Sequence, residues 1–243
     1  MPIFYYPEIS KNCKKLEIYG EEYNHIRNSL RKHENEKISI TNGVGLLATG
    51  YIEKVYENKI IINISEIYEK KKSKPHIALA FSMLKKNNNL VIEKCTELGI
   101  YEFFPFISQR TIKKNYSQKL TEKFKKVSIS ALKQSDSLHL PQINPTTNFN
   151  ELMNNLQENY LPILAWEEEK NQLLNQTLIN IQKDICLIVG PEGGFKFDEV
   201  EFAKEHSAKT ISLGNHILRG ETAAIVIAAN TLFYHIQKDK SFY

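Results

Sequence analysis

Residues 37–64 alternate apolar and polar positions with a period of two. Isoleucine recurs at every second position in two runs, at Ile38 and Ile40 and again from Ile60 to Ile64, and the pair Asn42-Gly43 follows the first run. Such alternation predicts strands with one buried face, and an Asn-Gly pair favours a tight hairpin turn. We therefore predict several short strands joined by hairpins.

A short amphipathic segment precedes these strands. Tyr23, Ile26 and Leu30 have the spacing of one helix face, and the basic residues Arg27 and Arg31 lie beside them. We therefore predict a compact, mostly β module that contains these strands and one helix with basic residues.

The segment from Glu69 to Pro75 separates two different patterns. It is rich in lysine, has no hydrophobic period and ends in proline, which is typical of a linker. We place the domain boundary there, so that residues 1–72 form the mostly β domain and residues 73–243 form the second domain.

Beyond Pro75, short apolar runs alternate with helical patterns. The runs cover residues 76–84, 101–107, 161–166, 185–189 and 210–213. This alternation predicts an α/β domain with a mostly parallel sheet. A final helix, at about 221–237, is apolar over most of its circumference, so it must be buried in the core or against another subunit.

Composition narrows the class of protein. The 243 residues are 42% hydrophobic, which is enough to bury a substantial core, and no apolar run is long enough to span a membrane. The first residues lack the pattern of a signal peptide, so we expect a cytoplasmic protein. Cys13, Cys95 and Cys186 lie far apart, without the spacing of a zinc site or a disulfide framework. A net charge of +4 does not by itself indicate a nucleic-acid partner, although the basic residues are clustered.

The first candidate site is the glycine-rich turn Gly190-Pro191-Glu192-Gly193-Gly194-Phe195, which directly follows an apolar strand. Ligands bind at the carboxyl ends of parallel strands, and glycines there let the backbone approach a ligand closely. The turn matches neither the dinucleotide-binding nor the P-loop pattern. A tight strand-to-helix turn without a ligand is the alternative.

The second candidate site is the segment Leu213–Ala223, which leaves a short strand and enters the last helix. Glu221 and Thr222 suit a helix N-terminus. Arg219 does not, because a cation is unfavourable at the positive end of the helix dipole. We therefore expect Arg219 to have a partner, either Glu221, Glu192 or a substrate phosphate.

Taken together, the two segments resemble the C-terminal motifs of the SPOUT class of RNA methyltransferases. The resemblance continues in residues 92–99, 109–110 and 131–141, and in residues 25–31, so it covers nearly the whole chain. It implies an α/β C-terminal SPOUT domain with a mostly parallel sheet and a deep trefoil knot, preceded by a small PUA-like β-barrel domain. It also implies a homodimer.

The resemblance further implies S-adenosylmethionine as the cofactor and N3 of a uridine in 16S ribosomal RNA as the methyl acceptor. The residues implied to contact the cofactor are Val189, Gly190, Glu192, Gly193, Leu213, Gly214, Ile217 and Leu218. Those implied in catalysis are Arg219, Glu221 and Thr222, with Glu221 either the base or an orienter of Arg219. Those expected to contact RNA are Arg27, Arg31, Arg110 and Lys113. Because the sulfonium carries an activated methyl group, no metal is expected.

Four positions depart from the family pattern: Ser137, Lys196, His216 and Gly220. These departures motivate a second hypothesis, an RNA-binding protein that keeps the fold without catalysis. A third hypothesis is a metabolic α/β enzyme that uses the glycine-rich turn to bind phosphate.

Overall fold

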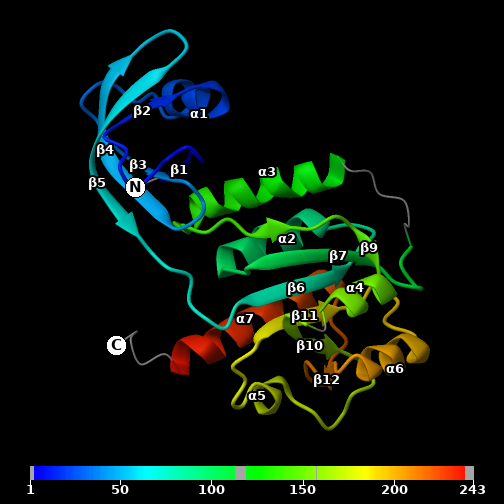
Figure 1. Ribbon diagram of the computed structural model, residues 1–243. Coiled ribbons are helices and arrows are strands. Elements are labelled where there is room, and N and C mark those ends of the chain that lie inside the picture. Colours follow the sequence, from blue (N-terminus) through cyan, green and yellow to red (C-terminus); the bar gives the residue numbers. More distant parts are fainter. Residues whose placement is uncertain (1–2, 113–118, 157, 239–243) are drawn as a thin grey trace. The chain divides into compact units, whose positions relative to one another are not determined.

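The computed structural model of the chain describes residues 3–112, 119–156 and 158–238 (Figure 1). Contacts between residues divide the chain into two compact units. The first unit comprises residues 1–72 and 129–140, and the second comprises residues 73–128 and 141–243. The sequence-based division at residue 72 thus omitted the return of residues 129–140 to the first unit.

The first unit is a curled five-stranded sheet with the strand order β1-β3-β4-β5-β2. Its elements are β1 (Ile3–Tyr5), β2 (Lys15–Ile18), α1 (Gly20–Asn24), the π-helix η1 (His25–Ser29), β3 (Lys37–Thr41), β4 (Leu46–Val55) and β5 (Ile60–Glu69). The antiparallel pairs β3–β4 and β4–β5 confirm the expected hairpins. Register shifts after Thr49 and Ile52 increase the local twist, and the isoleucines of the inner face form the core.

Residues 129–140 join the first unit through backbone pairing with the turn between β3 and β4. Gly45 N–H donates to the Leu138 carbonyl at 2.9 Å, and Leu140 N–H donates to the Gly43 carbonyl at 2.8 Å. Both glycines have positive φ, and a Cβ added at Gly45 would lie 2.5 Å from the Lys70 carbonyl oxygen. This pairing joins segments that are far apart in the chain, so no local sequence pattern predicts it.

The second unit is built on a seven-stranded sheet, with the order β12-β10-β11-β6-β7-β8 and β9 pairing with β7. Its strands are β6 (Ile77–Ser82), β7 (Glu102–Ile107), β8 (Gln142–Ile143), β9 (Thr147–Asn148), β10 (Tyr160–Ala165), β11 (Asp184–Val189) and β12 (Lys209–Ile211). Every pairing is parallel, which confirms the predicted α/β architecture.

The helices of this part of the chain cover the sheet. They are α2 (Asn88–Leu98), α3 (Lys119–Gln134), whose last residues belong to the first unit, α4 (Phe149–Leu156), α5 (Leu174–Thr177), α6 (Phe197–Glu205) and α7 (Gly220–Lys238). No helix in the described ranges is long and apolar enough to cross a membrane.

Both faces of the parallel sheet are buried. Successive residues of β11 alternate between two hydrophobic clusters, with Leu187 and Val189 in one and Cys186 and Ile188 in the other. This explains why the sequence of the strand is a continuous apolar run.

Cys95, on α2, is buried in the core that this helix forms with the sheet. Burial raises the pKa of its thiol to about 12, so this thiol stays protonated at neutral pH.

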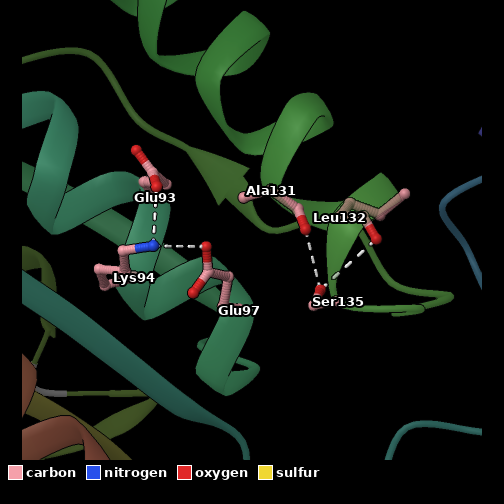
Figure 2. Close-up of polar contacts among 6 residues, drawn as sticks. All are labelled: Glu93, Lys94, Glu97, Ala131, Leu132 and Ser135. Atoms are coloured by element: carbon pink, nitrogen blue, oxygen red, sulfur yellow. Dashed lines mark hydrogen bonds and ion pairs between the residues drawn. The ribbon is translucent and has the colours of Figure 1, made fainter.

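Figure 2 shows local polar contacts within α2 and at the end of α3. On α2, the Lys94 ammonium contacts Glu93 at 2.8 Å and Glu97 at 2.9 Å, and the hydrogen bond to Glu93 is the main reason that its pKa is raised. At the end of α3, Ser135 Oγ donates to the Ala131 carbonyl at 2.9 Å. Lys94 therefore has its charge neutralised within its own helix.

Phe195 anchors the glycine-rich turn to the core. The residue is 3% exposed, and its ring packs against those of Phe106 and Phe149, with centroid distances of 6.3 and 5.3 Å. The same ring lies against Gly190, where an added Cβ would come within 2.9 Å of it. The turn is therefore fixed at its end by aromatic packing.

Replacement of Phe195 by alanine should lower the free energy of unfolding by about 3–5 kcal/mol, because it leaves a cavity beside the rings of Phe106 and Phe149. The measurement is urea denaturation of the purified protein. Phe197→Ala is the matched control, since Phe197 is 67% exposed and lies two residues away. An equal effect of the two changes would contradict the anchoring role.

Candidate functional site

A cavity of about 630 Å³ opens at the carboxyl ends of β10, β11 and β12. Its volume is typical of a site for a small molecule. It is lined by residues 165–168 and 170, by the glycine-rich turn 189–194, by residues 212–218, and by Gly220 and Ala223 of α7. All eight residues predicted to contact the cofactor are among these lining residues: Val189, Gly190, Glu192, Gly193, Leu213, Gly214, Ile217 and Leu218. The two sequence motifs are thus walls of one cavity.

The glycine-rich turn has no room for side chains at its tip. Gly194 has a φ of +67°, and a Cβ added there would collide with the carboxylate of Glu167. The following helix α6 begins beside a buried carboxylate, because Glu199 accepts hydrogen bonds from the N–H groups of Lys196 at 3.0 Å and Gln109 at 2.9 Å. Glu199 therefore holds the helix start at which Lys196 departs from the family pattern.

Arg110, in the turn that follows β7, holds the glycine-rich turn by hydrogen bonds. Its Nη1 donates to the Gly193 carbonyl at 2.8 Å and contacts the Phe195 carbonyl at 3.4 Å. Next to it, Gln109 Nε2 donates to Asp198 at 2.9 Å, and this hydrogen bond is the largest contribution to the lowered pKa of that carboxyl. Arg110, which was predicted to contact RNA, thus has protein partners on the cofactor side.

Buried hydroxyl groups fix the segment that carries Arg110. Ser82 Oγ lies 2.8 Å from Thr111 Oγ1, and Ser108 N–H donates to the same Thr111 oxygen at 2.9 Å. These three residues are buried at the ends of β6 and β7. Isolated Ser and Thr residues carry no sequence pattern, so their role could not be predicted from the sequence.

The loop after β12 forms the other wall of the cavity. Gly214 has a φ of +121°, which favours glycine. Leu213 and Leu218 are partly buried against the main core, whereas Ile217 is 90% exposed. His216, one of the departures from the family pattern, is also exposed on this wall. The side chain of Ile217 is thus an apolar surface that a ligand in the cavity can contact.

The predicted catalytic residues lie at the start of α7. The side chains of Arg219 and Thr222 are exposed, and Glu221 is partly buried. Glu221 Oε1 accepts a hydrogen bond from Asn87 Nδ2 at 2.9 Å, and Glu192 Oε1 accepts one from the Lys85 N–H at 2.8 Å. Among the described residues, no hydrogen bond or ion pair joins Arg219 to either carboxylate.

The segment 84–88, which the sequence analysis did not single out, connects the two motifs. Besides the bonds to Glu192 and Glu221, it places Leu84 against Gly220, where an added Cβ would come within 2.6 Å of Leu84 Cδ2. Gly220 thus departs from the family pattern at a position with no space for a side chain. The run Asn87-Asn88-Asn89, which lies between the apolar strand β6 and the body of α2, is the signal that points to this segment.

The remaining predicted residues lie elsewhere. Arg27, in η1, and the exposed Arg31, with a φ of 52°, belong to the first unit. Ser137 also belongs to that unit, and its Oγ accepts a hydrogen bond from the His139 N–H at 3.3 Å. Lys113 lies outside the described residues. Within the described ranges, no group of three or more His, Cys, Asp or Glu residues has the arrangement of a metal site.

The chain is similar to known RNA methyltransferases over most of its length. Residues 71–232 match the family model of the RNA methyltransferase domain, and residues 18–65 match that of the RNA methyltransferase PUA domain. Ribosomal RNA small subunit methyltransferase E of Rickettsia conorii is 30% identical over 218 residues, which cover 88% of each chain. The Bacillus subtilis protein of the same name is 29% identical over 91% of this chain and 92% of its own.

Solved structures give the same result. The crystal structure of ribosomal RNA small subunit methyltransferase E from Neisseria gonorrhoeae, bound to S-adenosyl methionine, superposes with a TM-score of 0.86 at 25% identity. The match covers 96% of this chain and 97% of that chain. The chain therefore belongs to the RNA methyltransferase family whose members include ribosomal RNA small subunit methyltransferase E.

Proposed function

We propose that this protein transfers the methyl group of S-adenosylmethionine to N3 of a uridine in the 16S RNA of the small ribosomal subunit, in the cytoplasm. The observation that carries the proposal is the cavity in which both family motifs meet. Similarity to the solved Neisseria relative, which binds the cofactor, supports the same assignment. Family membership argues against a metabolic phosphate-binding enzyme, so the non-catalytic RNA-binding protein is the remaining alternative.

The lining of the cavity suits this cofactor. Gly190 and Gly193 offer bare backbone groups, and Val189 and Leu218 offer apolar surface for an adenine ring. Glu192 lies on the same wall, which suits the positive charge of the cofactor. When bound, S-adenosylmethionine supplies an activated methyl group, and the protein has to align the attacking nitrogen with it.

Residues at the start of α7 are placed to assist the acceptor. Uridine N3 carries a proton that must leave, and negative charge then develops on the uracil carbonyl oxygens. Arg219 can stabilise that charge or hold a phosphate, because its guanidinium is exposed beside the cavity. Glu221 uses one carboxylate oxygen for Asn87, which leaves the other for the N3 proton or for Arg219. The exposed hydroxyl of Thr222 completes the proposed group.

The acceptor base must be accessible at its pairing edge. N3 takes part in Watson–Crick pairing, so the uridine has to be unpaired or flipped out of its stack when it reacts. We therefore assign Arg27 and Arg31 of the first unit to contacts with the surrounding RNA, which would be recognised largely by its shape.

The decisive test is methyl transfer from labelled S-adenosylmethionine to small ribosomal subunits that lack the modification, followed by nucleoside analysis. Wild type should produce N3-methyluridine. Arg219→Ala should reduce the rate by about 100-fold or more, as expected for loss of a group that stabilises developing charge, without changing the affinity for the cofactor. Lys204→Ala, which removes a cation paired with Glu201, should leave the rate unchanged.

Two outcomes would overturn parts of this assignment. A folded wild type that binds the subunit and transfers no methyl group would favour the non-catalytic RNA-binding protein. An Arg219→Ala variant as active as wild type would remove Arg219 from the catalytic group.

The glycine-rich turn provides a separate test of the cofactor site. Gly194→Ala should weaken S-adenosylmethionine binding, measured by calorimetry, by about tenfold or more, because the new methyl group must displace Glu167 and the turn with it. Gly20→Ala is the matched control, since Gly20 has the same φ of +67° with no neighbour within 4 Å of an added Cβ. Equal cofactor affinity in the two variants would argue against the turn as a cofactor wall.

We also propose that the protein is a homodimer that uses α7. One side of this helix is buried through Ala224, Ile227 and Ala228, whereas Phe233 is 59% exposed and Ile236 is 42% exposed. A second copy of the same helix would cover these side chains.

Strand order supports the expected knot. Strand β12 lies beyond β10 at the sheet edge, and the chain then returns so that α7 packs on β6 and β11.

Light scattering of the purified protein should give twice the chain mass of 28.2 kDa. Phe233→Asp should shift the population toward the single-chain mass, since it would bury a charge in the interface. Ile179→Asp, at a residue 57% exposed elsewhere, should not. A single-chain mass for wild type would contradict the dimer.

A further inference from the structure

A second hollow, of about 390 Å³, lies beside the cofactor cavity in the second unit. It is formed by residues 83–90, which run from the end of β6 into α2, and by Leu120, Lys123 and Phe124 of α3. Its floor is apolar and buried, because Met83, Leu84 and Phe124 belong to the main core. The hollow is therefore a surface depression whose floor is part of the packed core.

Three lysines surround this depression. Lys85, Lys86 and Lys123 are exposed, and no acidic residue is among its lining residues. None of the three forms an ion pair with a residue in the described ranges. Lys94, further along α2, shows the contrast, because it is neutralised by Glu93 and Glu97 (Figure 2).

Such an arrangement favours a polyanion. Cations gathered around one concave surface repel one another and raise the local concentration of negative ligands. Lysines in this arrangement bind phosphate oxygens as point charges, with a contribution that depends on salt. Of the three asparagines among the lining residues, Asn87 binds Glu221 and Asn88 binds both backbone groups of Leu84. The charge of the three lysines and the amide of Asn89 are thus what remain for a ligand.

The hollow shares a wall with the cofactor cavity. The wall is the segment 84–87, in which Leu84 packs on Gly220, Lys85 N–H binds Glu192, and Asn87 binds Glu221. The carboxylate of Glu221 therefore contacts a residue that also lines the hollow.

We propose that this hollow is a subsite for the phosphodiester backbone of RNA, and that it holds the strand beside the uridine that enters the cofactor cavity. The identity of the RNA rests on the proposed function, whereas the phosphate chemistry rests on the three lysines. Contacts of this kind position a strand without reading its sequence.

The test compares a triple variant, Lys85→Gln with Lys86→Gln and Lys123→Gln, with wild type in binding to small ribosomal subunits at several KCl concentrations. The slope of log affinity against log salt should become shallower by about 2, because each phosphate contact contributes about 0.7 for a single strand. Affinity for S-adenosylmethionine should stay within twofold, since the backbone of the shared wall is retained.

The charge-matched control is Lys94→Gln with Lys204→Gln and Lys209→Gln, of which the first two lysines are paired with glutamates. It should leave the slope unchanged. Equal slopes for the two triple variants would overturn the subsite. If wild type transfers no methyl group yet the hollow variant alone loses salt dependence, the catalytic assignment fails and the RNA subsite stands.

Discussion

Burial of both faces of the parallel sheet is the constraint on which the second unit depends. Since helices cover the two faces, the strand ends are the places where the backbone can meet a ligand. Strand β11 shows how this works, because its side chains alternate between two cores until Val189 and the chain then turns through three glycines within five residues. The same constraint brings the ends of β10 and β12 to one cavity, although their loops are separated in the chain.

The loops at that edge are held by contacts that come from several other segments. Phe195 fixes the glycine-rich turn from the core, and Arg110 fixes it through the carbonyls of Gly193 and Phe195. The segment 84–88 then connects this turn to the start of α7. A cavity wall made of bare backbone is thereby kept in one shape, which is what a preorganised binding site requires.

Local patterns account for what the sequence predicted well. The period-two isoleucines predicted β3 to β5, and the continuous apolar runs predicted five of the seven parallel strands, all except β8 and β9. The eight residues predicted to contact the cofactor line one cavity, and their contact with the cofactor stays a prediction. Contacts between distant segments account for what it missed. The return of residues 129–140 depends on Gly43 and Gly45, and the segment 84–88 depends on carboxylates more than 100 residues away. The helix expected near residue 26 is a short α1 followed by a π-helix, a distinction that spacing alone does not make.

The burial of two cysteines also determines where this protein reacts with thiol reagents. Cys95 and Cys186 lie in the core of the second unit, and burial raises the pKa of both thiols, so neither forms the nucleophilic thiolate near neutral pH. Cys13, in the first unit, is partly exposed. Alkylation and oxidation are therefore directed to one sulfur atom in the first unit, which gives the folded chain a single natural attachment point for a chemical label.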